Sequence, residues 1–382
     1  MSLSWWSRVL APDGSLQRGP GRQGDEVYVA LPGVRAPSIL ADADSTAAVR
    51  GALVRSEAGI GRHEQLVRSA AAKAASNLRV RRRLPNLVHV PAGSGVTLRA
   101  ELESRLGVEA RLWATAGPVR PNRKPVIRVL DGSDRVVAFA KVGWDRATAE
   151  MVDTEADALA SLRERPCRGL IVPDVVDHFA WSGLSILVTR PLPIQDRPTA
   201  EPDAEIESLV RLVEYGGRSH EPLARAPWWQ SLRRRLGPFD RLAADEEVRS
   251  GDEAIDLGGH HGDWSPWNIR RTVSDMGLYV WDWERSRVDG PVGVDAAHYV
   301  LQVGRFIDGQ TVAAAAQRAE DALVEHLPAF GVDPSRAALL VRLELLETVA
   351  RMVESGLADQ LIDRRDEIIA VLESARPAGA PT

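Results

Sequence analysis

Cysteine, lysine and asparagine are scarce in this sequence, and long apolar runs are missing. With a single cysteine, Cys167, among 382 residues, no disulfide can form within the chain, which fits a reducing compartment. No apolar run approaches the roughly 18 residues that a membrane-spanning helix needs. The apolar stretch within residues 1–14 is too short for the apolar region of a signal peptide. We therefore expect a soluble, cytoplasmic protein that does not bind a membrane.

Positive charge is not in excess either. The formal net charge at pH 7 is −5, whereas general nucleic-acid binders usually carry a basic face, so nucleic acid is not an expected partner. Hydrophobic residues make up 44% of the chain, an ordinary fraction for a globular protein, and the length allows two or three domains. Nothing in the composition indicates an oligomeric state.

The shortage of lysine makes each lysine informative. Lysine occurs only at Lys73, Lys124 and Lys141, so nearly all of the 48 basic residues are arginine. A compact ammonium and a planar guanidinium are not interchangeable against phosphate oxygens. Lys73 and Lys124 have neighbours typical of a surface, whereas Lys141 ends an apolar strand candidate at 136–142. Lys141 is therefore a candidate for binding phosphate.

Residues 1–105 are expected to form a separate N-terminal module of unknown function. They contain strand candidates at 26–31 and 38–40 and a long helical stretch at about 46–77. The arginine-rich run at 79–83 favours a solvated face or a contact with the next domain over an anion site. We find no chemistry in this module.

Residues 106–190 and 191–382 have contrasting patterns. The first range contains strand candidates at 110–116, 125–130, 136–142, 171–176 and 184–189 and a helix candidate at 148–162. The second range contains helix candidates at 206–215, 228–236, 311–327, 335–355 and 358–374, and a loop with two short strands at 260–284. The expected fold class is therefore α+β, with a small β-rich nucleotide-binding lobe followed by a larger helical lobe.

The residues that can carry chemistry are concentrated at 260–284. The sequence reads HGDWSPWN at 261–268 and DWE at 282–284. Phosphoryl transfer needs a carboxylate near the attacking hydroxyl, oxygen ligands for Mg²⁺, and a cation on the nucleotide phosphates. Asp263 and Asn268 lie five positions apart on one loop and can point into one site, and Asp282 follows a neighbouring strand candidate.

These two motifs resemble the catalytic loop and the metal-binding motif of aminoglycoside phosphotransferases and choline kinases, relatives of the protein kinases. The resemblance covers about residues 108–300 and implies a bilobal, protein-kinase-like fold with ATP and Mg²⁺ as co-substrate and cofactor. It also implies that Asp263 is the catalytic base and that Asn268 and Asp282 bind Mg²⁺.

The resemblance implies supporting roles for three further residues. His261 becomes a packing and hydrogen-bonding residue of the loop instead of a general base. Glu284 supports the metal site, and Asp295 braces the catalytic loop from the start of the next helix. Four tryptophans are expected to pack around this loop and not to stack on substrate: Trp264, Trp267, Trp281 and Trp283.

The family also carries a lysine on its third strand that contacts the α- and β-phosphates. A glutamate from the following helix pairs with this lysine. The matching residues are Lys141 and Glu155, and Glu150 is a competing partner on the same helix candidate.

The resemblance places the segment that contacts the adenine at about 188–192, which makes Thr189 and Leu192 candidate nucleotide contacts. Pro191 has no N–H to donate, so either Leu192 supplies the donor or the purine is held differently. The choice between ATP and GTP stays open on this ground.

The expected function is transfer of the γ-phosphate of ATP or GTP to a hydroxyl of a small molecule, a sugar or an aminoglycoside-like compound. A catalytically quiet, kinase-like binding or regulatory protein is the alternative. A scaffold has no physical need for the intact set of Lys141, Asp263, Asn268 and Asp282. The late glutamates, Glu344, Glu347 and Glu354, either attract a cationic acceptor or are solvated.

Overall fold

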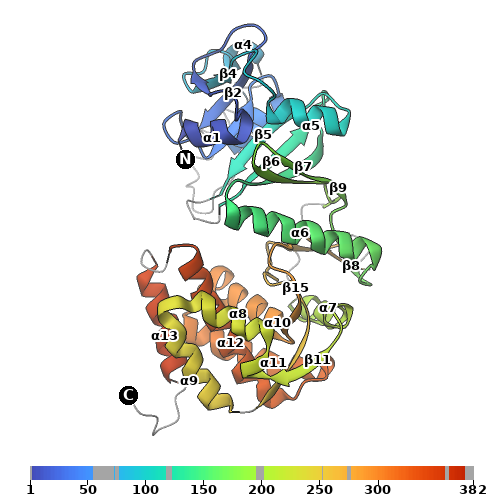
Figure 1. Cartoon of the computed structure of the whole chain (residues 1–382), viewed down its shortest axis with the longest axis vertical. Coiled ribbons are helices and arrows are strands. Elements are labelled where there is room, and N and C mark those ends of the chain that lie inside the picture. Colours follow the sequence, from blue (N-terminus) through green and yellow to red (C-terminus); the bar gives the residue numbers. More distant parts are fainter. Residues whose placement is uncertain are drawn as a thin grey trace. The chain divides into compact units, whose positions relative to one another are not determined.

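The structure is a computed structural model that describes residues 2–54, 73, 77–117, 123–194, 202–251, 253–272, 277–357 and 361–374. The chain divides into two compact units. The first comprises Met1–Val119, Arg123–Ala156 and Asp174–Pro191, and the second comprises Arg120–Asn122, Asp157–Pro173 and Leu192–Thr382. The first unit is built on a β-sheet and the second is mostly helical (Figure 1), so the expected α+β class is confirmed.

The first unit contains one nine-stranded sheet in the order β1-β4-β2-β3-β5-β6-β7-β10-β9, with every neighbouring pair antiparallel. The strands are β1 (Gln17–Arg18), β2 (Glu26–Leu31), β3 (Ile39–Asp42), β4 (Leu87–Val90), β5 (Arg111–Ala116), β6 (Pro125–Leu130), β7 (Val136–Gly143), β9 (Val175–Trp181) and β10 (Leu184–Thr189). The strand candidates at 26–31, 125–130 and 184–189 have the same bounds in the structure. Burial alternates over the first residues of β6, whereas β2 is buried at four consecutive positions.

Residues 1–105 do not form a compact unit of their own, which differs from the sequence-based expectation. β3 pairs with β5, with Ile39 opposite Thr115 and Ala41 opposite Trp113, so the N-terminal strands continue the sheet. Without them β5 would be an open sheet edge, which proteins usually cover. The helices that the structure describes in this region are α1 (Leu3–Leu10), α2 (Thr46–Val54), α4 (Leu78–Arg81) and α5 (Leu98–Leu106). Most of the helix expected beyond residue 54 lies outside the described residues.

The N-terminal helices share a hydrophobic core with the central strands. Trp6 of α1 and Leu98 of α5 are fully buried in the same core as Ile127 of β6 and Val142 of β7. The indole N–H of Trp6 donates a hydrogen bond to the Pro37 carbonyl oxygen at 2.8 Å. The N-terminal residues and the central strands are therefore expected to unfold together.

The strand candidate at 171–176 is divided between the two units. β8 (Leu170–Ile171) pairs in parallel with β14 (Leu278–Val280) of the second unit, and β9 begins only at Val175. Pro173 between them has no N–H and cannot extend a strand ladder. Helix α6 (Arg146–Glu164) precedes this break.

The second unit is a set of helices with two small sheets. Its helices are α7 (Pro202–Tyr215), α8 (Pro227–Leu236), α9 (Asp240–Ser250), α10 (Val294–Gln302), α11 (Val312–His326), α12 (Ala337–Glu354) and α13 (Ile362–Ser374). One sheet has the order β11 (Ser219–Pro222), β12 (Ala254–His260), β15 (Arg287–Pro291), and the other joins β13 (Ile269–Arg271), β14 and β8. α12 packs against α8, α10, α11 and α13 (Figure 1). Among the described residues, no helix has the length and apolar character that a bilayer crossing requires.

We predict that Trp6→Ala lowers the free energy of unfolding of the first unit by about 3–5 kcal/mol, the usual cost of truncating a buried tryptophan. Urea denaturation followed by circular dichroism measures this change. The control is Val54→Ala, because Val54 is an exposed residue at the end of α2. A Trp6→Ala change smaller than 1 kcal/mol would contradict a core shared by the N-terminal helices and the central strands.

Candidate functional site

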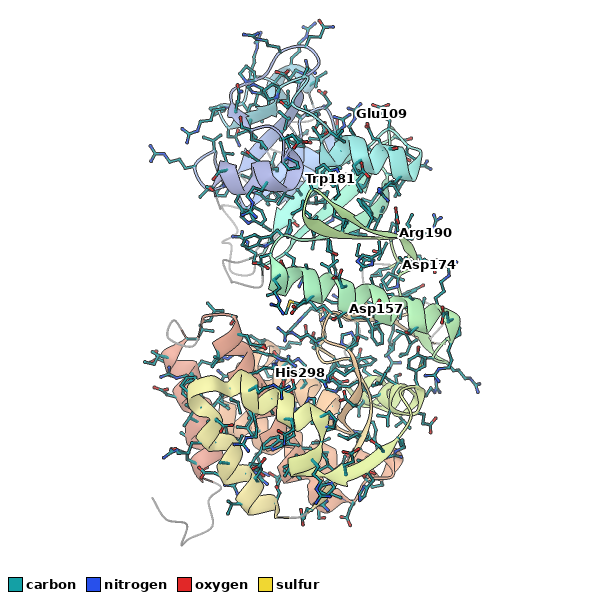
Figure 2. All side chains as sticks on the ribbon, in the orientation of Figure 1. Glu109, Asp157, Asp174, Trp181, Arg190 and His298 are labelled. Carbon is teal, nitrogen blue, oxygen red and sulfur yellow. The ribbon has the colours of Figure 1, made fainter. Side chains whose placement is uncertain are left out.

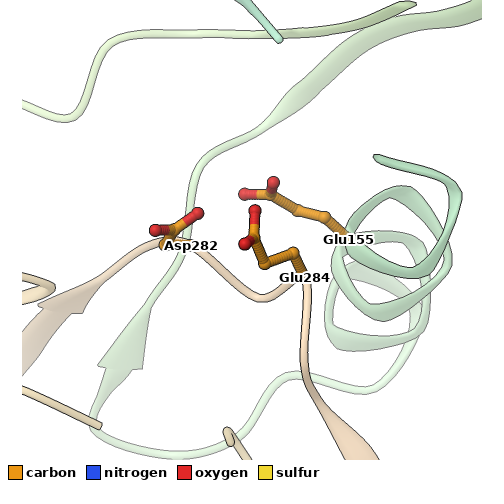
Figure 3. A group of neighbouring side chains, drawn as sticks. All are labelled: Glu155, Asp282 and Glu284. Carbon is orange, nitrogen blue, oxygen red and sulfur yellow. The ribbon is translucent and has the colours of Figure 1, made fainter. Parts of the chain in front are cut away.

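In the first unit, the expected pair of Lys141 and Glu155 is formed. The Lys141 ammonium lies 2.7 and 2.6 Å from the two carboxylate oxygens of Glu155, and the two side chains are 18% and 3% exposed. Lys141 comes from β7, whose neighbours Ala140 and Val142 point to the opposite, buried face. Glu155 comes from α6 (Figure 3). The competing Glu150 instead pairs with Arg146 on an exposed part of the same helix.

The segment expected to contact the adenine begins at the end of β10. Thr189 is the last residue of that strand and lies opposite Phe139 of β7. The Arg190 N–H donates to the Asp174 carbonyl oxygen at 2.9 Å, and the Leu192 carbonyl oxygen accepts from the Ile194 N–H at 2.8 Å. The Arg190 amide is therefore already used within the protein, so it is not the donor to a purine.

In the second unit, the loop after β12 is held by the first turn of α10. The Asp295 carboxylate accepts hydrogen bonds from the backbone N–H groups of His261 and Gly262 at 2.6 and 2.9 Å. Gly262 has φ +81°, and a Cβ there would lie 2.4 Å from the Arg285 carbonyl oxygen. Only glycine fits this close approach. Asp295 thus has the bracing contacts that the resemblance implied.

His261 is a buried linker within the loop. Its Nδ1 accepts a hydrogen bond from the Asp263 N–H at 3.1 Å, so the proton of the neutral ring is on Nε2, which lies 3.2 Å from the Trp281 carbonyl oxygen. Burial lowers the pKa of His261, although nearby carboxylates oppose the change. Its ring contacts the rings of Trp264 and Trp283 edge to face. Both ring nitrogens of His261 are thus engaged within the protein, in agreement with the hydrogen-bonding role that the resemblance implies.

Asp263 and Asn268 are in direct contact. The Asn268 side-chain N–H₂ donates to the Asp263 carbonyl oxygen at 3.0 Å and to Asp263 Oδ2 at 2.9 Å. These bonds fix the orientation of the amide and leave its oxygen as the atom that can face a cation.

Asn268 and Asp282 are neighbours across the β13–β14 pair. Ile269 lies opposite Val280, and the Trp281 N–H donates to the Asn268 carbonyl oxygen at 3.1 Å, so Asp282 follows the residue opposite Asn268. Asp282 has φ +72°, a left-handed conformation that Asp adopts more readily than most residues. Among the described residues other than glycine, Asp134 and Ser182 also have a positive φ, and both lie in hairpin turns. Backbone strain outside a turn often accompanies a functional site.

The loop that carries Asp282 also carries Glu284, two residues later (Figure 3). Together with the Asn268 amide oxygen, this segment supplies only hard oxygen donors. Such donors suit Mg²⁺ and do not suit the soft metals that select thiolate. The residues present in the second unit therefore fit a magnesium ion.

The sequence-based reasoning missed His298, which bridges two carboxylates. Its Nε2 lies 3.0 Å from Asp263 Oδ1 and its Nδ1 lies 2.7 Å from Glu344 Oε1. The His298 and Glu344 side chains are only 3% and 1% exposed. His298 lies in the interior of the helical unit (Figure 2). His298 is therefore in direct contact with the candidate catalytic carboxylate of Asp263.

The charges in this cluster set the protonation states. Burial alone would lower the pKa of His298, but the Glu344 charge and the hydrogen bonds with Asp263 and Glu344 raise it to about 9. Burial alone would likewise raise the pKa of Asp263, but the hydrogen bond and charge of His298 outweigh it and hold that pKa well below its usual range. At neutral pH His298 is therefore an imidazolium beside an ionised Asp263 carboxylate.

Arg351 of α12 adds a second cation under the same loop. Its guanidinium donates to the Gly262 carbonyl oxygen at 2.5 Å and lies 3.9 Å from Asp263 Oδ1. Glu347 pairs with Arg351 at 3.1 Å and with Arg235 of α8 at 2.6 Å. Arg235 also pairs with Glu354 at 2.6 Å.

These pairs correct the expectation for the late glutamates. Glu344 and Glu347 are buried, whereas Glu354 is 36% exposed, and each of the three pairs with a positive side chain of the same unit. A signal for this arrangement is present in the sequence. Positions 344, 347, 351 and 354 share one face of an otherwise apolar helix, and His298 is one turn after Asp295.

The tryptophans divide into two groups. Trp264 and Trp283 are buried, as expected, and Trp228 and Trp229 are buried on α8. Trp267 differs, because it is 43% exposed, and Trp281 is half-buried.

Comparison with solved structures returned small-molecule phosphotransferases. A GDP complex of wild-type aminoglycoside 2'-phosphotransferase-IIIa is 16% identical, covers 72% of this chain and 95% of that chain, and has a TM-score of 0.43. Spectinomycin phosphotransferase in complex with ADP and spectinomycin is 12% identical, covers 73% and 94%, and has a TM-score of 0.41. An aminoglycoside phosphotransferase from Alicyclobacillus acidocaldarius is 15% identical, covers 68% and 90%, and has a TM-score of 0.35.

These structures include the family that the motifs at 261–284 resemble. The sequence identities and TM-scores of these structures do not assign a function to this chain. The function proposed for it rests on its own residues. No protein-family model matches the sequence, and no curated protein matches it.

We predict that His298 makes the stability of the second unit depend on pH between about 6.5 and 9. The folded pKa of about 9 lies above the unfolded value of 6.5, so the stabilisation is complete below pH 6.5 and is lost as pH rises through 9. The loss amounts to about 3 kcal/mol. The measurement is urea denaturation across this pH range.

The test variant is the double substitution His298→Gln with Glu344→Gln, which removes both charges together and avoids an unpaired buried carboxylate. It should flatten the pH dependence. His220→Gln is the matched control, because His220 is an exposed histidine paired with Asp256. An unchanged slope in the double variant would show that His298 is not the titrating group.

Proposed function

We propose that this protein is an ATP- or GTP-dependent phosphotransferase that moves the γ-phosphate to a hydroxyl of a small molecule. The observation that carries the proposal is the arrangement in the second unit. There, an ionised Asp263 carboxylate contacts the Asn268 amide, and Asn268 lies across a strand pair from Asp282. A carboxylate beside a set of hard oxygen donors is the arrangement that phosphoryl transfer requires.

Asp263 is the residue that orients the acceptor hydroxyl. Because its pKa is lowered, the carboxylate is ionised at neutral pH but is a weak base. Its main contribution is therefore to accept a hydrogen bond from the hydroxyl and align the oxygen for in-line attack, taking the proton as the new P–O bond forms. Positioning of this kind supplies most of the catalysis in phosphoryl transfer.

Asn268 and Asp282 are the proposed magnesium ligands, with Glu284 as a support in the same loop. When bound, Mg²⁺ neutralises charge on the nucleotide phosphates. The hydrogen bonds from the Asn268 N–H₂ group orient its oxygen, and the left-handed backbone at Asp282 sets the direction of its carboxylate.

In the first unit, Lys141 is the proposed contact to the α- and β-phosphates. The nearly buried Glu155 holds the Lys141 ammonium in place before nucleotide binds. Binding therefore costs little of the conformational entropy of the lysine side chain. Thr189 and Leu192 are the proposed contacts to the base. A catalytically quiet binding protein is less well supported. Burying the charges that contact Asp263 costs desolvation free energy, and a protein that only binds has no need to keep this carboxylate ionised.

We predict that Asp263→Ala lowers kcat by at least about 10²–10⁴-fold, the usual contribution of a positioned acid or base, while nucleotide affinity changes little. Transfer from [γ-³²P]ATP to an acceptor panel and calorimetric titration with ADP measure the two quantities. Asp321→Asn is the control, because Asp321 is an exposed carboxylate on α11. Equal turnover by Asp263→Ala and wild type would refute the assignment.

We predict that Lys141→Met weakens nucleotide binding by about 10- to 100-fold, since a charge-assisted hydrogen bond contributes about 1.5–3 kcal/mol. The rate of transfer should also fall. Lys73→Met is the matched control, because Lys73 is exposed and is one of only three lysines in the chain. If both lysine variants bind ADP and ATP with wild-type affinity, Lys141 does not contact the phosphates.

A further inference from the structure

The junction of β7 with α6 lies between the two residues of the proposed phosphate contact. Lys141 is on β7, two positions before the last residue of that strand, Gly143, and Glu155 is on α6. A Cβ at Gly143 would lie 2.5 Å from the Cα atom of Ala149 in the first turn of α6, so the strand and the helix touch through their backbones. The geometry of this junction therefore determines where the Glu155 carboxylate lies relative to the Lys141 ammonium.

The start of α6 is closed by hydrogen bonds around Thr148, which is fully buried. The Thr148 N–H donates to Asp145 Oδ1 at 2.8 Å, the arrangement of a helix N-cap. The Thr148 hydroxyl oxygen accepts from the backbone N–H groups of Trp144 and Asp145 at 3.0 and 3.1 Å. The backbone of Trp144 is thus part of the cap of the helix that carries Glu155.

The Trp144 side chain connects this cap to the N-terminal helix. Its indole N–H donates to the Arg123 carbonyl oxygen, two positions before β6, at 2.7 Å. Its ring meets the ring of Trp5 on α1 edge to face, with centroids 5.6 Å apart, and both rings pack against the core of the first unit. The Arg8 guanidinium, one turn along α1, lies 5.9 Å from the centroid of the Trp144 ring. Two residues of α1 therefore contact the ring that belongs to the cap of α6.

Helix α1 is itself held in place by contacts with the chain that follows it. The Leu16 N–H donates to the Ser7 hydroxyl oxygen at 2.9 Å, and the fully buried Trp6 donates to the Pro37 carbonyl oxygen. A helix fixed in this way presents Trp5 to Trp144 in one orientation, so it can restrain the junction.

A small movement at the junction is enlarged at Glu155. Glu155 comes ten positions after Asp145, which is about 15 Å along the helix axis. A tilt of α6 by about 4° at its cap therefore moves the Glu155 carboxylate by about 1 Å. The distances from the Lys141 ammonium to the two carboxylate oxygens are 2.7 and 2.6 Å, so a shift of this size away from the ammonium breaks the hydrogen bonds.

We propose that helix α1, through the contact of Trp5 with Trp144, positions the Lys141–Glu155 pair and thereby sets the affinity for the nucleotide phosphates. Trp5 and Trp144 are positioning residues, which act through Glu155 and not by touching the nucleotide. The inference rests on the proposed function and gives a part in it to residues 1–10, in which the sequence indicated no chemistry.

The test is a calorimetric titration of the full chain with ADP and Mg²⁺, at a temperature at which circular dichroism shows each variant to be folded. Trp5→Ala removes the ring, Trp5→Leu keeps part of its apolar volume, and Trp5→Phe keeps a ring. Leu102→Ala is the control for a general loss of stability. Leu102 is fully buried in the same core but lies on α5, so its truncation leaves both tryptophans in place.

We expect Trp5→Ala to weaken ADP binding about threefold to tenfold and to raise the KM for ATP by a similar factor, the effect of losing an aromatic pair. Trp5→Leu should weaken ADP binding at least about twofold, whereas Trp5→Phe should stay within about twofold of wild type. Leu102→Ala should unfold at lower urea concentration but bind ADP with wild-type affinity.

A double-mutant cycle tests the route through Glu155. Glu155→Gln removes the charge that holds the Lys141 ammonium. In that background Trp5→Ala should change ADP affinity by less than about twofold, because the contact through which it acts is already lost.

Any of three results would overturn the inference. The first is ADP affinity within about twofold of wild type in Trp5→Ala, or in Trp5→Leu if the alanine variant does not fold. The second is an equal loss of affinity in Leu102→Ala, which would show an effect of stability alone. The third is the same loss from Trp5→Ala whether residue 155 is Glu or Gln. Failure of the proposed function looks different, because Lys141→Met and Glu155→Gln would then bind ADP with wild-type affinity.

Discussion

The buried contact between His298 and Asp263 is the interaction on which the candidate site depends. A carboxylate in a mostly buried loop would tend to become protonated, and a protonated Asp263 could not take up the proton of an acceptor hydroxyl, which is the role proposed for it. The imidazolium of His298 keeps it ionised, and Glu344 in turn keeps His298 charged. The bonds from Asp295 to the backbone fix the loop, while this chain of charges fixes the chemistry of its side chain.

The features that could be predicted from the sequence are those with a local pattern. Strands β6 and β10 were predicted with their observed bounds because each is a short apolar run that ends at a local stop signal, the turn at 131–134 for β6 and Pro191 for β10. The Lys141–Glu155 pair was predicted because lysine is rare here and because one glutamate on the next helix matched a known motif. The roles of the paired residues in binding nucleotide remain predictions.

What the sequence did not reveal depends on partners far apart in the chain. The role of His298 requires Glu344, 46 residues later, and no single-segment pattern connects them. The pairing of β3 with β5 was missed for the same reason, since the sequence pattern of a strand does not indicate which other strand it pairs with. Glu344 and Glu347 were misjudged because their partners, His298 on α10 and Arg235 on α8, lie 46 and 112 positions away in the chain. The exposed Trp267 departs from the expected packing because a proline turn directs it outward.

The pairing of β3 with β5 has a consequence for how the chain acquires its structure. Ile39 must find Thr115, and β7 must then find β10, before the central part of the sheet is complete. Contacts between such distant positions slow folding, because closing a long loop costs entropy before the strand pairing that stabilises it can form. On the ribosome, one edge of β3 stays unpaired until residues near 116 have been made, so the nascent chain passes through an interval with an open sheet edge, which favours aggregation. The strand order therefore makes β3 depend on a pairing partner that is synthesised more than seventy residues later.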